Sequence, residues 1–145
     1  MTFPRRGAKH DALEAFVGHW QAVGETFDEF GKPRGPWIST HSAQWHSGKF
    51  FLVQDEHANG PFDTLAVMGW DDEKQRYFSR TIENHGHARE YAVVNEGRVW
   101  TFTGEHERAR CEFSEDGKTQ TIAWQWKPGN ASWTALCNRV VTKVE

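Results

Sequence analysis

Turn-forming residue pairs interrupt the chain at short intervals from Gly18 onward. Examples are SG at 47–48, DG at 116–117 and PG at 128–129, and the runs between such pairs are rich in Val, Thr, Phe and Trp. Short β-forming runs separated by tight turns are typical of an antiparallel meander. The pattern predicts an all-β fold of about ten strands, at residues 19–27, 36–46, 49–57, 62–70, 76–83, 87–94, 98–104, 106–113, 119–126 and 132–142.

An open meander of this length would leave two long strand edges unpaired, and closure into an up-and-down barrel removes them. One short helix is predicted before the strands, at residues 11–17, because Asp11 and Glu14 form a capping-box pattern ahead of apolar residues. The length of 145 residues fits a single domain, 1–145, with its core at about 11–143.

Tight turns also predict which residues face one another across the last two hairpins. A turn at 116–117 places Cys111 opposite Ile122. A turn at 128–129 then places Trp124 opposite Trp133, with Cys137 and Arg139 on the same inward face. Cys111 and Cys137 would stand two strand spacings apart, roughly 9 to 10 Å, which excludes a disulfide.

Two earlier hairpins extend the inward face. A turn at 96–97 pairs Tyr91 with Phe102 and Val93 with Trp100, and a one-residue slip would scatter these rings over both faces. Around the turn at 47–48, we favour as interior the face with the inward set His41, Trp45, Phe50, Leu52, Gln54 and Glu56.

The predicted interior is therefore rich in aromatic rings, as is the whole sequence, which has 8 Trp and 10 Phe but only 2 Met. An apolar lining with a few polar groups is typical of a small-molecule site. Ten strands enclose more space than eight, which favours a cavity over an interior filled by side chains. The candidate ligand-binding residues are His41, Trp45, Tyr91, Trp100, Phe102, Trp124, Trp133 and Arg139.

Charge and hydropathy argue against two classes of partner, nucleic acids and membranes. The formal net charge is -3, and Lys and Arg are dispersed along the chain, so a nucleic-acid partner is not expected. No apolar run reaches the roughly 20 residues of a membrane span, which predicts no membrane partner and a cytoplasmic protein.

A catalytic site and a metal site are the alternatives to simple ligand binding. His41, Gln54 and Glu56 would face one way, and a His beside a carboxylate can act as a general base, as in an isomerase- or cyclase-like enzyme. His85 and His87 flank a glycine in what reads as a solvated turn, so no metal site is predicted.

The sequence also resembles known barrels. Gly18-His19-Trp20 matches the G-x-W that opens calycin barrels, and the order SGKFFLVQDE, VMGWDDEKQRYF, VWTFTGE, FSEDGKT and a closing W-x-x-x-x-N-R resembles an uncharacterised domain-of-unknown-function family of lipocalin-like barrels. The resemblance spans about residues 11–143 and implies the barrel fold, but it implies no activity.

More distant resemblances add two expectations. Fatty-acid-binding proteins imply an interior Arg near the last strand that anchors a carboxylate, and Arg139 has such a position, with an exposed Arg at the barrel rim as the alternative. Nitrobindins bind haem through a His in their C-terminal part, whereas here no His follows His106. No cofactor is therefore predicted, and a haem held by His41 or His87 is kept as an alternative.

Together these observations predict a barrel that binds a small hydrophobic or aromatic molecule. The alternatives are an enzyme that uses the same pocket, a haem-binding barrel, and an interaction barrel that pairs with another subunit, including as a homodimer.

Overall fold

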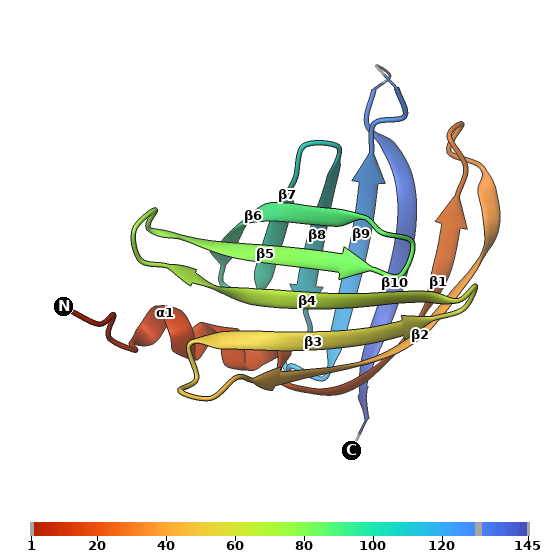
Figure 1. Ribbon diagram of the computed structural model, residues 1–145. Helices are drawn as coiled ribbons and strands as arrows, with labels where there is room; N and C mark the ends of the chain where they lie inside the picture. The colour runs from red at the N-terminus through yellow and green to blue at the C-terminus, as the bar shows by residue number, and fades with distance from the viewer. Residues whose placement is uncertain (1, 130–131, 145) are drawn as a thin grey trace.

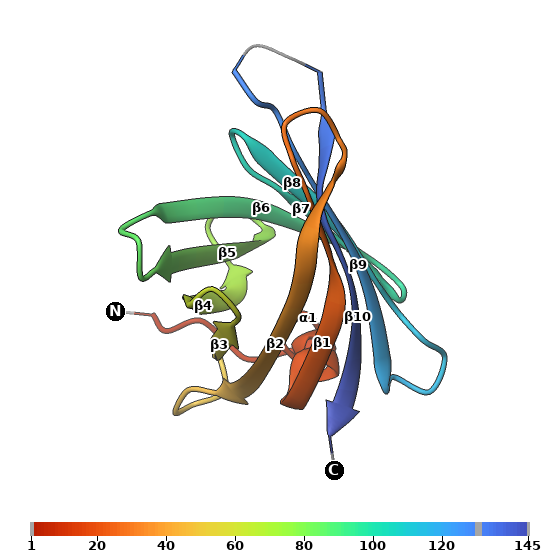
Figure 2. The ribbon, with the colours of Figure 1, turned by 90° about the vertical axis from the view of Figure 1, so that its right-hand side faces the viewer.

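Consecutive antiparallel strands pair with their neighbours around a complete ring, and the last strand returns to the first (Figures 1 and 2). The computed structural model describes residues 2–129 and 132–144. Within them, the predicted ten-stranded, closed up-and-down barrel is confirmed. The strands are β1 Gly18–Phe27, β2 Pro33–Trp45, β3 Phe51–Ala58, β4 Phe62–Asp71, β5 Arg76–Glu83, β6 Ala88–Glu96, β7 Val99–Thr103, β8 Glu107–Phe113, β9 Thr119–Trp126 and β10 Thr134–Val144.

One predicted register and one predicted inward face are confirmed, although on β2 and β3 Trp45 lies opposite Leu52 and not next to Phe50, a shift of two residues. Cys111 lies opposite Ile122 on the β8–β9 pair, as the turn at 116–117 requires. On β2 and β3 the interior is the predicted face, since His41 and Leu52 are buried while Phe51 on the other face is exposed. Alternation between the two faces therefore follows the sequence closely in these hairpins.

The β6–β7 register differs from the prediction by two residues. Val93 lies opposite Phe102, and Asn95 lies opposite Trp100. The Asn95 amide donates to the backbone oxygens of Gly97 and Val99, which holds a turn one residue later than expected. Since side chains alternate with a period of two, a shift by two keeps the predicted rings on the inward face.

The predicted β9–β10 register is wrong. Cys137, not Trp133, lies opposite Trp124. Within this strand pair the register also shifts between Ala135 and Cys137. Pairing begins only at Trp126 and Thr134, so the connection is longer than the two-residue turn assumed from Pro-Gly. The predicted turn position Asn130 lies outside the described residues. Both cysteines are free, in agreement with the predicted absence of a disulfide.

The helical segment precedes β1 and begins earlier than predicted. A single α-helical turn, α1, spans Ala8–Asp11, and a 3-10 helix spans Ala12–Phe16. Asp11 does not cap it; its carboxylate forms an ion pair with Arg6. Glu14 does not complete a capping box either, because its carboxylate accepts the indole N–H of Trp45. None of the described helices is long and apolar enough to cross a membrane.

This segment fills one end of the barrel (Figure 2). Leu13 is fully buried, and the Phe16 ring lies 5.0 Å from the Trp100 ring and 5.1 Å from the Phe113 ring. The indole N–H of Trp20 donates to the Phe16 oxygen at 2.9 Å, which satisfies a buried polar group. We call this filled region the closed end; the loops that follow β1, β3, β5, β7 and β9 surround the opposite end.

Barrel closure depends on a close approach of β1 to β10 at Gly24. A Cβ atom built at Gly24 would lie 1.8 Å from the backbone oxygen of Asn138. No side chain fits there unless the strands separate. Gly35, on the neighbouring strand β2, has nothing within 4 Å of such an atom.

We expect Gly24→Ala to lower the free energy of unfolding by about 2–4 kcal/mol, because the added methyl group forces β1 and β10 apart. Gly35→Ala is the matched control and should change it by less than about 1 kcal/mol. Urea unfolding followed by Trp fluorescence measures both variants. Equal stability of the two variants would show that the approach at Gly24 does not govern closure.

Candidate functional site

A cavity of about 750 Å³ lies in the barrel beyond the closed end. This volume is within the range of small-molecule sites in proteins. Every strand contributes inward side chains on alternate positions, and the last ring of the closed end, Phe16, forms part of its lining. The large apolar groups on its wall include Trp37, Leu52, Phe62, Met68, Phe102, Ile122 and Trp124.

Polar side chains on β2, β3 and β10 form a connected group on the wall, which we call the wall cluster: Trp37, Ser39, His41, Glu56 and Arg139. The three β2 residues are alternate positions and so face inward together, and Glu56 lies opposite His41 on β3. The Trp37 indole N–H donates to Ser39 Oγ at 2.9 Å, and Ser39 Oγ donates to Glu56 Oε2 at 3.0 Å. The buried carboxylate is thereby held in place.

Arg139 provides the counter-charge to Glu56. Its Nη1 lies 3.5 Å from Glu56 Oε2, and its guanidinium carbon lies 3.8 Å from the centre of the Trp37 ring. Only 15% of its side chain is exposed. Of the two alternatives drawn from the sequence, the structure therefore has the interior Arg and not the rim Arg. A buried ion pair with a cation–π contact needs no further charge nearby.

His41 is the member of the wall cluster that lacks a hydrogen bond. Its ring stacks on Trp20 at 6.2 Å, and Nδ1 lies 3.9 Å from Glu56 Oε2, beyond hydrogen-bond range. Nδ1 is buried without a partner among the described residues, a condition that costs about 1–3 kcal/mol. Burial lowers the pKa of His41; Glu56 opposes this effect and Arg139 adds to it. The imidazole is therefore neutral at pH 7.

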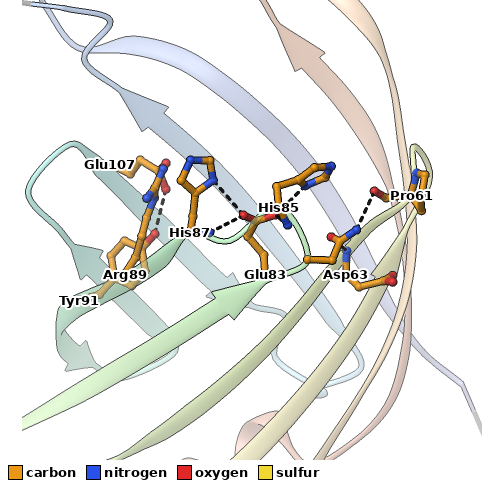
Figure 3. Close-up of polar contacts among 9 residues, drawn as sticks. Pro61, Asp63, Glu83, His85, His87, Arg89, Tyr91 and Glu107 are labelled. Atoms are coloured by element: carbon orange, nitrogen blue, oxygen red, sulfur yellow. Dashed lines mark hydrogen bonds and ion pairs between the residues drawn. The ribbon is translucent and has the colours of Figure 1, made fainter.

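A second polar group lies at the open end and joins β5 to β6 (Figure 3). Glu83 accepts the backbone N–H groups of His85 and His87, each at 2.8 Å, and its oxygens lie 2.7 and 2.9 Å from the two ring Nδ1 atoms. Although burial opposes it, these donors lower the pKa of Glu83 to about 2. The carboxylate thus fastens the turn between the two strands.

Beside it, Glu107 binds two neighbours from β6 (Figure 3). The Tyr91 hydroxyl donates to Glu107 Oε2 at 2.8 Å, and Arg89 Nε donates to Oε1 at 3.0 Å. Burial, with the neighbouring carboxylate, raises the pKa of Tyr91 well above its ordinary value. Tyr91 therefore stays a hydrogen-bond donor, and its carboxylate partner is neutralised by Arg89.

Five of the eight predicted binding residues line the cavity: His41, Tyr91, Phe102, Trp124 and Arg139. Trp45 and Trp100 do not. Trp45 lies beneath the Arg6 guanidinium, and Trp100 is buried against Phe16 and Tyr77 in the closed end.

Trp133 does not line the cavity either. It lies on the outside of the barrel, where the Arg108 and Lys127 charges are 4.3 and 4.8 Å from its ring centre. Its predicted place followed from the wrong β9–β10 register.

Sequence reasoning missed two important lining residues, Trp37 and Phe62, and also the buried Ser39 that accepts the Trp37 indole N–H. The signal for two of them was present, because alternation from His41 back along β2 places Ser39 and Trp37 on the same inward face. Phe62 begins β4 directly after a turn, where the face of the first residue is not fixed by a pattern. Glu56 was expected inside, but only as a partner of His41; its ion pair with Arg139 joins strands distant in sequence.

The two histidines considered for haem differ in their surroundings. The His41 side chain is only 6% exposed beside the stacked Trp20 ring, and a porphyrin does not fit at such a buried ring. His87 is 60% exposed, and its Nδ1 lies 2.9 Å from Glu83; a carboxylate on one ring nitrogen is the usual arrangement of a ligating His and does not exclude ligation by the other. Among the described residues, no group of three or more His, Cys, Asp or Glu is placed to hold a metal ion.

Burial of His41 should make stability depend on pH. Because its pKa is lower in the folded than in the unfolded state, the unfolded chain binds a proton first as pH falls through about 6.5. The contribution of His41 to the free energy of unfolding should therefore decrease from pH 7.5 to 5.5, by at most about 1.4 kcal/mol per pH unit.

His41→Gln should reduce that decrease, whereas His106→Gln, at an exposed loop position, should leave it unchanged. Urea unfolding of the wild type and both variants at the two pH values measures the difference. An unchanged pH dependence in His41→Gln would mean that the ring is not held neutral by burial.

The chain matches a known protein family over most of its length. A sequence profile described as "Protein of unknown function (DUF1579)" matches residues 5–135. No curated protein matches the sequence.

Solved structures with the same fold are also found. The Rv2717c protein of M. tuberculosis has a TM-score of 0.71 at 11% sequence identity, covering 97% of this chain and 100% of its own. The zebrafish ileal bile acid-binding protein, solved in complex with cholic acid, has a TM-score of 0.59 at 14% identity, covering 90% of this chain and 99% of its own. At these identities the likeness shows a shared barrel fold, of the calycin type.

Proposed function

Starting from a chain that belongs to the DUF1579 family of proteins of unknown function, we propose that the barrel binds a small hydrophobic or aromatic molecule in its interior. The observation that carries the proposal is the cavity of about 750 Å³ with its wall of aromatic and aliphatic side chains. The zebrafish protein with the same fold is complexed with cholic acid, which supports this use of such a barrel.

The energetics support this function. Removing a ring or a branched aliphatic group from water contributes about 1.5–3 kcal/mol, and micromolar binding needs about 8 kcal/mol. A ligand that covers Trp37, Phe62, Phe102 and Trp124 meets enough apolar surface to reach that range, after the cost of association. Binding therefore requires no covalent or metal contact.

Binding is favoured over catalysis by the state of His41, the candidate general base that the sequence offered. His41 and Glu56 lie 3.9 Å apart and do not form a hydrogen-bonded dyad. Glu56 is already occupied by Ser39 and Arg139. The arrangement is suited to orienting a bound molecule rather than to moving a proton.

The proposal is tested with N-phenyl-1-naphthylamine, a neutral probe whose fluorescence rises in apolar surroundings. We expect saturable binding with a dissociation constant in the micromolar range. Ala66 lines the cavity on β4, so Ala66→Trp should fill part of it and weaken binding about tenfold or more.

Leu65→Trp is the matched control, since Leu65 precedes Ala66 on the same strand and is 40% exposed on the outer face. It should bind the probe like the wild type. Absence of saturable binding, or equal affinity in the two Trp variants, would refute a ligand site inside the barrel.

A further inference from the structure

Three buried polar groups on the cavity wall lack a hydrogen-bond partner among the described residues: His41 Nδ1, Gln120 Nε2 and Trp126 Nε1. The indole N–H and the amide NH2 are donors only. The Glu56 carboxylate lies 3.9 Å from His41 Nδ1, and its negative charge favours the imidazole proton on that nitrogen. All three groups are therefore donors that lack an acceptor.

Gln120 is the most deeply buried of the three residues, with 2% of its surface exposed. Its amide oxygen lies 3.4 Å from Cys111 Sγ, and burial raises the pKa of Cys111 to about 12, so that residue remains an S–H donor. A thiol that donates to the amide oxygen leaves the NH2 group without an acceptor. A buried donor in this state costs about 1–3 kcal/mol when it is cut off from water.

Two of the unpaired donors lie at the floor of the cavity, where the closed end begins. Gln120 is opposite Phe113 on β8, and His41 is opposite Trp20 on β1. The Phe113 and Trp20 rings contact each other in the closed end, with centres 6.3 Å apart. Trp126 lies six residues further along β9, a rise of about 20 Å toward the open end.

These donors determine which ligands suit the floor. A ligand that covers them also excludes water from them. A hydrocarbon would leave the N–H groups unpaired, and displacing water without replacing its hydrogen bonds lowers affinity. A carbonyl oxygen has two lone pairs and brings no donor of its own, so it fills what this floor lacks.

A carboxylate is the charged alternative, and the free cation for it lies elsewhere on the wall. Arg139 is paired with Glu56 at 3.5 Å, and Arg89 is likewise paired at the open end. Arg34 also lines the cavity and forms no ion pair within the described residues, but it is exposed and lies seven residues before His41 on β2, a rise of about 23 Å. A carboxylate at the floor would stand beside Glu56 without a free counter-charge, which is unfavourable.

We propose that the ligand has an uncharged carbonyl oxygen at its buried end, which accepts a hydrogen bond from the Gln120 amide, with the His41 imidazole as a second donor at the same floor. This inference rests on the proposed binding function and names the chemical class of the ligand, an apolar ketone, ester or lactone. The carbonyl fills the unpaired donors, and the apolar body of the ligand covers the aromatic wall beyond them.

Three naphthalene derivatives of similar shape separate these requirements: 2-acetylnaphthalene, 2-isopropenylnaphthalene and 2-naphthoate. They carry a carbonyl, a hydrocarbon group of the same shape and a carboxylate. Each is titrated at pH 8 into protein that has bound N-phenyl-1-naphthylamine, and the probe's own affinity is measured separately for every variant. The quantity compared is the ratio of ketone affinity to hydrocarbon affinity, because comparing this ratio between two proteins cancels the different hydration of the ligands.

Gln120→Met keeps a side chain of similar size but has no donor. It should lower the ratio about fivefold or more, through loss of the hydrogen bond. Gln44→Met, the same substitution at an exposed position on β2, is the control and should keep the wild-type ratio. 2-Naphthoate should bind the wild type more weakly than the ketone does.

A measurement on the wild type alone does not depend on how a variant folds. 2-Acetylnaphthalene labelled with 13C at its carbonyl should, when bound, resonate downfield of its position in hexane, because a hydrogen bond to the oxygen deshields the carbonyl carbon. In Gln120→Met the resonance should return toward the hexane position.

The outcomes separate the two proposals. Absence of saturable probe binding in the wild type would refute the binding function itself. If the probe binds, any of four results overturns the inference about ligand class and leaves the binding function intact. They are an unchanged ratio in Gln120→Met, a bound carbonyl resonance at its hexane position, binding of 2-naphthoate as tight as that of the ketone, and loss of the ratio in Trp126→Phe instead, which would place the carbonyl at the open end.

Discussion

Pairing of β1 with β10 is the interaction on which the rest of the molecule depends. It runs from His19 opposite Val144 to Thr26 opposite Cys137, and it removes the two free edges that a linear meander would expose. Backbone hydrogen bonds on every strand are then satisfied by neighbours on both sides, so the inward side chains need not supply them. Only because the ring closes does an enclosed interior exist at all, and the absent side chain at Gly24 lets the backbones meet.

The interior is divided between a packed part and an empty part. Phe16, Trp20 and Trp100 form an aromatic layer at the closed end, which takes the place of the core that a barrel of this width otherwise lacks. Above that layer, polar groups on the wall hold one another, and their hydrogen bonds and ion pairs fix their positions. The largest fully buried rings, Trp20 and Trp100, therefore lie at the closed end, and the wall beyond it borders the cavity.

How far the sequence predicts this molecule depends on the kind of signal. Asp-Gly at 116–117 has a strong preference for a two-residue hairpin, and the register that follows from it is confirmed. Pro-Gly at 128–129 marks a bend but does not fix the loop length, so the β9–β10 register and the place of Trp133 were wrong. Alternation along β2 predicted the face of His41.

The alternation of residues along the strands does not predict the remaining features. The contact of Arg139 with Glu56 joins the tenth strand to the third, and the capping role assigned to Asp11 failed because Arg6 pairs with it instead. Such choices between competing partners depend on distances that only the closed barrel defines. Spacing along the chain supplies the candidates, and tertiary geometry selects among them.

Mutual pairing of charges at the open end has a kinetic consequence. Glu107 lies 3.0 Å from Arg89, and among the described residues the cavity lining has as many guanidinium groups as carboxylates, so their fields largely cancel a Debye length away. An opening of this kind neither attracts nor repels molecules from a distance. The rate at which an uncharged molecule enters is then set by diffusion and by the width of the opening, and it is indifferent to ionic strength.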